Sequence, residues 1–314
     1  MWTYVIRRLV AIPLMLFVLS FVLFLLVWTL PGDAAFATVA GIEEARNLDA
    51  WRAEFGLDRP WHVQYFDWLG GIITGDFGKS LTPPYDPVSR SITERLPNTI
   101  EIGLVTVLLS AAVSLPVGII SAVRRNTFLD YLLRTGTILG ISIPNFWLGT
   151  LVIIYAIVWF DWNPIQDYAT FTEEPLRNLS IIIFPAAVLA YSGAAYTARI
   201  VRSSMLEVFY SDHVRTARAK GLRERVVISR HVFRSALIPV LTVIGLQLGG
   251  ILGGAIVAEQ IFAIPGIGLL TLEALLARDY PLILVTVMIF AGIFMFITLL
   301  VDILYTRVDP RIRY

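Results

Sequence analysis

The sequence of 314 residues contains no cysteine and only three histidines, His62, His213 and His231. The missing cysteines exclude a disulfide scaffold, a thiolate metal site and a thiol nucleophile. The histidines are too widely separated to match a zinc motif, whose ligands have short spacings. The sequence therefore predicts no metal site and no cysteine-based chemistry.

Charge is also scarce, since Asp, Glu, Lys and Arg make up 16% of the chain, against about 25% in soluble proteins. Six stretches of 21 to 26 residues carry no charge at all: 9–32, 102–123, 135–160, 178–198, 235–258 and 280–301. About 20 helical residues cross a hydrocarbon core of roughly 30 Å, and a charge at its centre costs about 3 kcal/mol or more. We expect an all-α polytopic membrane protein with six transmembrane helices.

Signals for catalysis or an internal energy source are missing as well. There is no G-x-S-x-G motif, and no carboxylate lies inside the six stretches to relay protons. Glu101, Glu259 and Asp302 follow or precede the stretches, where helix capping and interfacial anchoring are expected. Segment 75–80 ends like a phosphate-binding loop, but Ile73 stands where that motif needs its first glycine. We expect a non-catalytic protein rather than an intramembrane enzyme. The chain can supply a transport pathway whose energy comes from another subunit, and a stand-alone secondary transporter or channel is the weaker alternative to this.

The net charge of +1 conceals a strong asymmetry. With the N-terminus in the cytoplasm, the segments on that side hold 17 basic and six acidic residues, and the outer segments hold eight and 18. The positive-inside rule therefore places both termini in the cytoplasm. The first stretch is longer than the 7–15 apolar residues of a signal peptide, so we interpret it as an uncut helix.

This topology divides the chain into four parts. Residues 1–32 form a cytoplasmic N-terminus and the first helix, and 33–101 form a small extracytoplasmic domain of short helices and turns. Residues 102–306 form a five-helix core with a cytoplasmic loop at 199–234, and 307–314 form a cytoplasmic tail.

Proline and glycine mark special positions within this core. Pro144 and Asn145 lie in the third stretch, where a proline kinks a helix. The spacing of Gly245, Gly249 and Gly253 allows close approach of another backbone. That neighbour is either a helix of the same chain or a second subunit across a translocation path. On the outer side, Pro265, Gly266 and Gly268 break the helix pattern, which predicts a re-entrant segment or one packed on helix ends.

The loop at 199–234 contains nine basic and three acidic residues. Helix-favouring residues run from 212 to 220, and Gly221 interrupts them before a second helical segment, which is typical of a C-terminal cap. The loop is either an ordinary basic loop that fixes topology or a short helical element that projects from the membrane.

Several motifs occur in order along the chain: Arg7-Arg8-Leu9, Pro31-Gly32-Asp33, Gly75-Asp76-Phe77-Gly78, Arg95-Leu96-Pro97-Asn98-Thr99, Pro144-Asn145-Phe146-Trp147-Leu148-Gly149, Arg202-Ser203-Ser204-Met205-Leu206-Glu207, Arg230-His231, Pro265-Gly266-Ile267-Gly268, Arg278-Asp279-Tyr280-Pro281 and Asp309-Pro310-Arg311. Together they resemble the inner-membrane permease subunits of ABC importers of the dipeptide, oligopeptide and nickel group. The resemblance implies the type I ABC importer permease fold.

In such permeases an E-A-A-x-x-x-G motif forms a coupling helix that docks on the ATPase subunit. In this chain the motif glycine is Gly221, and the positions of Glu-Ala-Ala are occupied by Arg215-Thr216-Ala217. Because the motif glutamate is replaced by arginine, the resemblance implies no salt bridge at this position. The resemblance favours the projecting element over the ordinary loop. The implied coupling residues are Arg215, Thr216, Ala217, Arg218, Ala219, Lys220, Gly221, Leu222, Arg223 and Glu224.

The resemblance also implies partners in a bacterial or archaeal cytoplasmic membrane. These are a homologous second permease subunit, two cytoplasmic ATPase domains that hold ATP and Mg, and an extracytoplasmic substrate-binding protein. The outer domain and the segment containing Pro265, Gly266 and Gly268 are expected to receive the binding protein. We expect no cofactor on this chain and no nucleic acid partner. The implied cargo is a di- or oligopeptide, with nickel, glutathione and oligosaccharides as alternatives.

Overall fold

The computed structural model describes residues 2–29, 53, 56–162 and 168–308. The motif at 31–33, most of the predicted outer segment before residue 56 and the motif at 309–311 lie outside the described residues. The chain divides into two compact units. One comprises Met1–Val5, Ile100–Ile264 and Phe296–Tyr314, and the other comprises Ile6–Thr99 and Pro265–Met295.

Both units are built from α-helices, and the long helices coincide with the predicted apolar stretches. These helices are α1 (Trp2–Thr29), α5 (Val88–Val123), α9 (Pro175–Phe209), α12 (Phe233–Phe262) and α14 (Tyr280–Val308). Within the described part of the chain, five helices are long and apolar enough to cross a membrane, and two bent helix pairs raise the number to seven at most. The predicted boundary at residue 101 falls inside α5, which begins at Val88.

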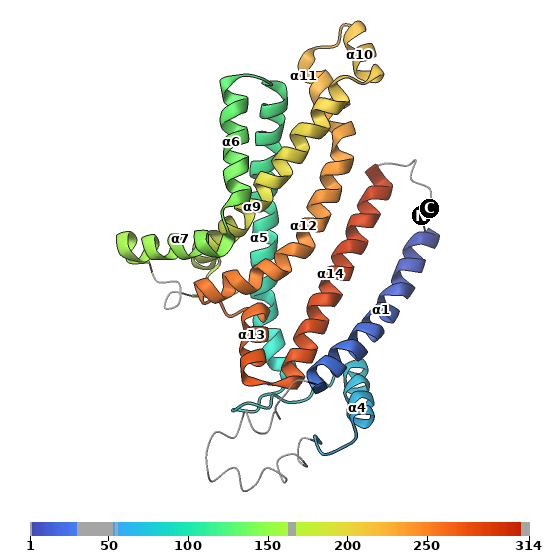
Figure 1. Cartoon of the computed structure of the whole chain (residues 1–314), viewed down its shortest axis with the longest axis vertical. Helices are drawn as coiled ribbons and strands as arrows, with labels where there is room; N and C mark the ends of the chain where they lie inside the picture. Colours follow the sequence, from blue (N-terminus) through green and yellow to red (C-terminus); the bar gives the residue numbers. More distant parts are fainter. Residues whose placement is uncertain (1, 30–52, 54–55, 163–167, 309–314) are drawn as a thin grey trace. The chain divides into compact units, whose positions relative to one another are not determined.

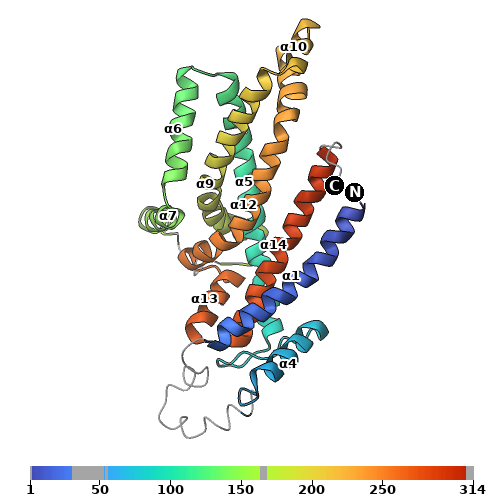
Figure 2. The same cartoon turned by 45° about the vertical axis from the view of Figure 1, so that its right-hand side comes forward.

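The third apolar stretch is not one kinked helix, as the sequence suggested, but two helices. These are α6 (Phe128–Ser142) and α7 (Asn145–Phe160), which meet at an angle of 96°. Ile143 and Pro144 adopt extended backbone angles between them. Proline lacks an N–H and disfavours helical geometry in the residue before it, so the helix stops here rather than bends. Figures 1 and 2 show α7 turned away from the direction of α6.

In the first unit, α9 lies at the centre and contacts α6, α7 and α12; Figures 1 and 2 show α5, α6, α9 and α12 side by side. Two glycines allow this close packing. A Cβ atom on Gly118 would lie 2.6 Å from the Cβ of Val201, and one on Gly140 would lie 2.6 Å from the Cβ of Ala195. Small residues at helix contacts let backbones approach closely where apolar burial gives little driving force.

The outer surface of α7 carries large hydrophobic side chains. Val158, Trp159 and Phe160 are each exposed by 69% or more. Such a contiguous apolar surface is unfavourable in water and matches a helix that faces lipid or another protein. Together with the long apolar helices, it identifies a multi-pass membrane protein.

In the second unit, α1 and α14 pack with α4 (Trp61–Thr74) and α13 (Ile267–Ala277) around a buried apolar cluster. Tyr65 of α4 is almost fully buried there, with its ring 5.4 Å from that of Phe24 and its hydroxyl 3.1 Å from Ser20 Oγ. The hydroxyl pair satisfies two polar groups that would otherwise be costly to bury. This core fixes the predicted outer segment, from α4 onward, to the long helices of its unit.

Motifs far apart in the sequence meet in this unit. The side chain of Asn98 donates to the carbonyl of Pro265 at 2.7 Å, and the hydroxyl of Thr99 accepts from the N–H of Ile267 at 2.8 Å. Asp279 is buried and accepts hydrogen bonds from the hydroxyl of Ser80 and from the N–H of Leu81. These contacts hold the start of α13 and the turn before α14 in fixed positions.

Candidate coupling element and polar cavity

A short helical element joins α9 to α12 at one end of the first unit (Figure 1). It consists of α10 (Asp212–Ala219), α11 (Glu224–Val226) and one π-helical segment, η2 (Val227–Val232). The structure confirms the predicted order of helix, glycine and second helix. Residues 211–226 will be called the coupling element, after the role that the resemblance predicts for residues 215–224.

Gly221 ends α10 in the way that the sequence predicts. Its φ angle is +72°, in the left-handed region that glycine adopts without strain. The N–H of Gly221 donates to Arg218 O at 2.9 Å, and that of Leu222 donates to Ala217 O at 3.4 Å. This pair of bonds is a Schellman cap, which satisfies the last carbonyls of a helix and turns the chain sharply.

The coupling element is anchored through one face of α10. Val214 and Ala217, three residues apart, are buried and pack in a cluster with Met205, Val227 and Val232. Ala217 is therefore part of the core and presents no surface. The other residues predicted for coupling are exposed: Arg215, Thr216, Arg218, Ala219, Lys220, Gly221, Leu222, Arg223 and Glu224.

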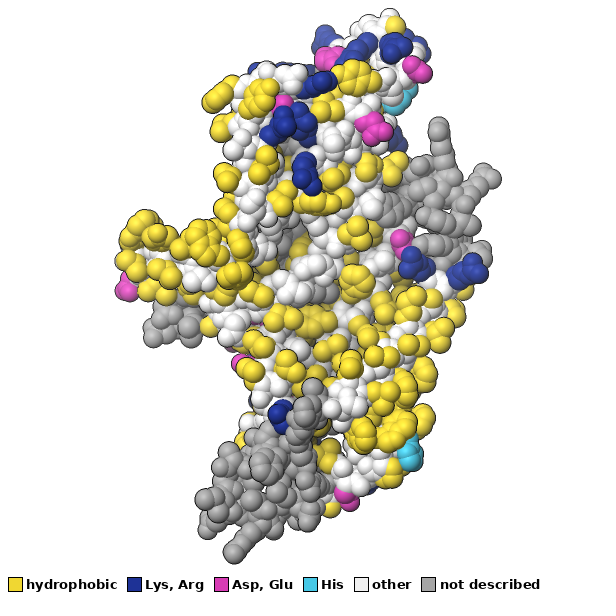
Figure 3. Space-filling model, in the orientation of Figure 1, with side chains coloured by type: hydrophobic (Ala, Val, Ile, Leu, Met, Phe, Trp, Pro, Cys, Tyr) yellow, Lys and Arg dark blue, Asp and Glu magenta, His cyan; other side chains and the backbone are white. Residues whose placement is uncertain are grey.

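Arg218 is exposed, but its side chain binds other residues of this chain. Its guanidinium makes two hydrogen bonds to the carboxylate of Glu224, at 2.7 and 3.2 Å, and lies 5.6 Å from the centre of the Phe209 ring. The bond to Glu224 raises the pKa of Arg218 above its ordinary value. One side chain thus connects the end of α9, α10 and the start of α11. Arg215 has an ion pair only within its own helix, with Asp212 at 3.6 Å. The larger exposed side chains left to form a docking surface are those of Arg215, Lys220, Leu222 and Arg223, and Figure 3 shows basic side chains clustered at this end.

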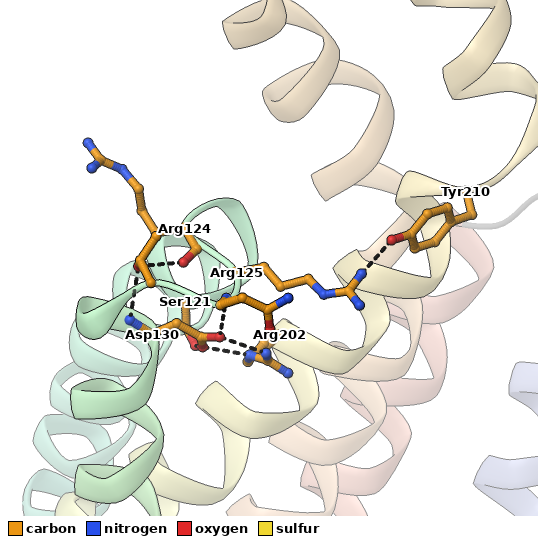
Figure 4. Close-up of polar contacts among 8 residues, drawn as sticks. Ser121, Arg124, Arg125, Asp130, Arg202 and Tyr210 are labelled. Carbon is orange, nitrogen blue, oxygen red and sulfur yellow. Dashed lines mark hydrogen bonds and ion pairs between the residues drawn. The ribbon is translucent and has the colours of Figure 1, made fainter.

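A buried ion pair connects the start of α6 to α9 (Figure 4). Arg202 donates from Nε and Nη2 to the two carboxylate oxygens of Asp130, both at 2.9 Å. The same carboxylate accepts from the hydroxyl of Ser121 and from the N–H of Asn126. Because every oxygen of Asp130 has partners, its complete burial is tolerated.

A second contact lies close to the coupling element. Arg125 donates to the hydroxyl of Tyr210, the C-cap residue of α9, which lies two positions before the start of α10 (Figure 4). The sequence did not single out Asp130, Arg125 or Tyr210. The one local sequence feature near these residues is Thr127, a residue type that favours the start of a helix. Its hydroxyl accepts a hydrogen bond from the N–H of Asp130. That pattern predicts the beginning of α6 but not the partner on α9.

A cavity of about 300 Å³ lies among α5, α7, α9 and α12. Its lining contains uncharged polar side chains and glycines: Thr106, Ser110, Asn145, Ser192, Gly193, Tyr196, Gln247, Gly250 and Gly254. Gln247 is held by the hydroxyl of Thr197 at 3.0 Å and donates to the carbonyl of Gly193 at 3.0 Å. Thr106 is buried, and its hydroxyl has no hydrogen-bond partner among the described residues. The cavity can therefore offer hydrogen bonds but no charge to a guest.

The predicted path residues are only partly at this cavity. Asn145 lines it, whereas Gly245, Gly249 and Gly253 do not. A Cβ atom on Gly245 would lie 2.5 Å from Val301 Cγ1, so this glycine packs against a helix of the same chain. Pro144 sets the break before α7 and thereby places Asn145. Two other glycines of α12, Gly250 and Gly254, line the cavity.

The residues predicted for the outer segment lie at the start of α13. Gly266 and Gly268 are buried at the start of α13, and Pro265 is half-buried. Glu259, for which interfacial anchoring was expected, is instead fully buried near the end of α12. The helix α12 continues to Phe262, beyond the charge-free stretch.

Comparison with known proteins gives consistent results. Residues 114–314 match the family described as "Binding-protein-dependent transport system inner membrane component", and residues 1–103 match the N-terminal component of such systems. A putative peptide transport system permease protein of Brucella abortus is 42% identical over 97% of this chain and 96% of its own length. The oligopeptide permease AppB and the dipeptide permease DppB of Bacillus subtilis are 38% and 39% identical, over 99% or more of this chain and 97% or more of their own lengths.

Solved structures show the same fold at low sequence identity. The inward-facing MetNI methionine ABC transporter matches with a TM-score of 0.58 and 16% identity, covering 69% of this chain and 96% of the matched chain. An amino acid ABC transporter crystallised with histidines matches with a TM-score of 0.54 and 13% identity, covering 70% and 94%. The type I importer permease fold expected from the sequence is thereby supported.

Proposed function

Because this chain belongs to the family of binding-protein-dependent transport system inner membrane components, we propose that it is the permease subunit of an ATP-driven importer of di- and oligopeptides. The named relatives, which align over 96% or more of their own lengths, are peptide permeases by name. The chain forms half of the translocation pathway, and a homologous second permease subunit forms the other half.

The coupling element carries this proposal. It is anchored by Val214 and Ala217, capped by Gly221 and open on its outer face, where Arg215, Lys220 and Arg223 are exposed. A rigid exposed helix at the end of two long helices is suited to receive a force and pass it to both of them. We assign its partner as a cytoplasmic ATPase subunit with complementary acidic groups.

The remaining roles follow from charge and topology. The excess of basic residues on one side supports a cytoplasmic location for both termini and for the coupling element. ATP and Mg are bound by two partner ATPase domains, and this chain is non-catalytic. Six transmembrane segments result if α6 and α7 together form the third and α13 remains on the outer side. There an extracytoplasmic binding protein delivers the peptide.

The polar cavity forms part of the translocation path. Transport requires a guest to enter without binding too tightly to leave. Uncharged groups such as Ser110, Ser192 and Gln247 can hydrogen-bond to a peptide backbone whatever its side chains are. Ion pairs would hold the guest too firmly, and the lining residues of the cavity include none of the charged types.

The decisive experiment reverses three exposed charges, in the variant Arg215→Glu/Lys220→Glu/Arg223→Glu. We expect the chain to reach the membrane normally but to lose co-purification with the ATPase subunits and at least about tenfold of peptide uptake, since like-charge contacts cost several kcal/mol. Lys79→Glu, an exposed reversal in the other unit, is the control for association with the ATPase subunits, which it should leave unchanged. Unchanged association and uptake in the triple variant would contradict the coupling role.

The cargo is tested separately in proteoliposomes that contain the whole transporter and its binding protein. We expect ATP-dependent uptake of labelled di- and oligopeptides, which unlabelled peptides suppress. Uptake suppressed by nickel, glutathione or oligosaccharides but not by peptides would keep the permease function and overturn the peptide assignment. Uptake by this chain alone, without ATPase subunits, would indicate a stand-alone transporter.

A further inference from the structure

An apolar groove runs along the first unit among α5, α6 and α9. Its volume is about 380 Å³, and its lining includes Val113, Val117, Leu133, Gly136 and Ala194. A Cβ atom on Gly136 would have no neighbour within 4 Å, so the groove is open at this glycine. The lining offers almost only aliphatic surface, which suits a hydrocarbon chain and not a peptide backbone.

The groove continues into a second hollow, which is lined in part by arginines. This hollow of about 230 Å³ shares Val117, Leu133, Thr137 and Ala198 with the groove. Three arginines also line it, namely Arg134, Arg199 and Arg202. One continuous surface therefore changes from apolar at one end to strongly basic at the other. Figure 3 shows dark blue side chains above a yellow surface on this part of the unit.

Two of the three arginines are available for a ligand. Arg202 is committed to Asp130 by its bidentate pair. Arg134 and Arg199 are exposed, and each lies over a tyrosine ring, at 5.9 Å from Tyr131 and 5.4 Å from Tyr196. Neither has an ion pair among the described residues. A ring beneath a guanidinium fixes its plane and leaves its N–H groups to bind an anion such as phosphate.

The polarity of this surface matches the geometry of a phospholipid in one leaflet. The basic end lies on the same side as the coupling element, near the turn between α5 and α6, where charge places the cytoplasm. Acyl chains extend from the headgroup toward the membrane centre, as the groove extends from the arginines. Basic pockets between transmembrane helices on the cytoplasmic side are suited to anionic headgroups.

We propose that this groove binds an anionic phospholipid of the cytoplasmic leaflet, with its phosphate on Arg134 and Arg199 and an acyl chain beside Gly136. The lipid contacts α6 and α9, the two helices that the Asp130–Arg202 pair joins. It therefore stabilises the same helix packing that supports the coupling element.

The test uses the full-length chain in detergent and native mass spectrometry with added lipids of identical acyl chains. We expect phosphatidylglycerol to be retained between about tenfold and thirtyfold better than phosphatidylcholine, since each arginine near an anionic headgroup contributes about a factor of five. In Arg134→Gln/Arg199→Gln, retention of phosphatidylglycerol should fall to the level of phosphatidylcholine. Arg215→Gln/Lys220→Gln is the control for loss of two positive charges elsewhere.

A second variant tests the groove independently of charge. Gly136→Leu should fill the open space and lower retention of both lipids, whereas Gly292→Leu, at an equally open glycine of α14, should not. Equal retention of the two lipids by the unaltered chain would overturn the proposal. So would displacement of phosphatidylglycerol by inorganic phosphate alone or by a substrate peptide. In the assembled transporter, a cross-link from residue 136 to the second permease subunit in place of lipid would also overturn it.

Discussion

The guanidinium of Arg202 and the carboxylate of Asp130 form a bidentate ion pair between α9 and α6, although Asp130 is completely buried and Arg202 is only 19% exposed. The hydroxyl of Ser121 and the N–H of Asn126 complete the coordination of the carboxylate. Arg125 of the same turn reaches Tyr210 at the end of α9. The turn between α5 and α6 is therefore fixed to the helix that leads into the coupling element.

Removing the buried charge should be costly. In Asp130→Asn, Arg202 keeps its charge without a counter-ion, and breaking a buried pair costs about 3–5 kcal/mol. We expect a correspondingly lower free energy of unfolding in detergent, measured by denaturant titration. Asp67→Asn, which breaks the exposed pair with Arg59, is the control.

The exposed pair should contribute about 1 kcal/mol or less. The double variant Asp130→Asn/Arg202→Gln should recover part of the loss, because it leaves no unpaired charge. A cost of Asp130→Asn no larger than that of Asp67→Asn would contradict the role of the buried pair.

The Schellman cap at Gly221 predicts a graded effect of substitution. A side chain in the left-handed region costs about 1–2 kcal/mol, less for asparagine and more for a β-branched residue. Gly221→Val should therefore loosen α10, speed hydrogen–deuterium exchange of its amides and weaken association with the ATPase subunits. Gly221→Asn should retain both properties. If valine and asparagine behave alike, the cap does not determine the position of α10.

The parts of the structure that the sequence predicted depend on local chemistry. Burying a charge in lipid is so costly that the charge-free stretches identify the long helices, and a glycine after helix-favouring residues identifies the end of α10. The resemblance to ABC importer permeases then predicts a coupling role for residues 215–224. Within that range, only the fold shows that Ala217 faces the core and that Arg218 is occupied by Glu224.

The parts that the sequence missed depend on contacts between distant segments. Asp130 and Arg202 are 72 positions apart, and composition treats them only as charges that set topology. Pro144 indicates a disturbance of the helix, but whether it produces a kink or a turn of 96° depends on what α7 packs against. The glycine spacing in α12 likewise indicates close packing without naming the neighbour, which at Gly245 is Val301.

Because Val301 lies so close, position 245 should not tolerate a side chain larger than that of glycine. A Cβ atom there would lie 2.5 Å from one γ-carbon of Val301 and 2.9 Å from the other. Gly245→Ala should lower the free energy of unfolding by about 1–3 kcal/mol, as overpacking does. Val301→Ala in the same chain should restore part of it, because it removes both γ-carbons and leaves only the Cβ atom of Val301, at 3.2 Å.

Gly253→Ala is the matched control for this substitution, because a Cβ atom there meets nothing within 4 Å. It should be neutral or stabilising by up to about 1 kcal/mol, the difference in helix propensity. Equal effects of alanine at the two glycines would show that α12 does not pack closely on Val301.

The absence of cysteine makes the polar cavity directly testable by single substitutions. Ser192 and Gln247 line the cavity, whereas Leu104 and Leu108 are exposed hydrophobic residues of α5 outside it. A thiol reacts as its thiolate, which forms in water but not in lipid. Ser192→Cys and Gln247→Cys should therefore react with a membrane-impermeant maleimide, and Leu104→Cys and Leu108→Cys should not. Labelling is measured by the mass of this chain in the assembled transporter.

Substrate peptide should slow labelling at the two cavity positions, because it competes for the same space. Equal labelling at all four positions, or no effect of peptide, would contradict the assignment of the cavity to the translocation path.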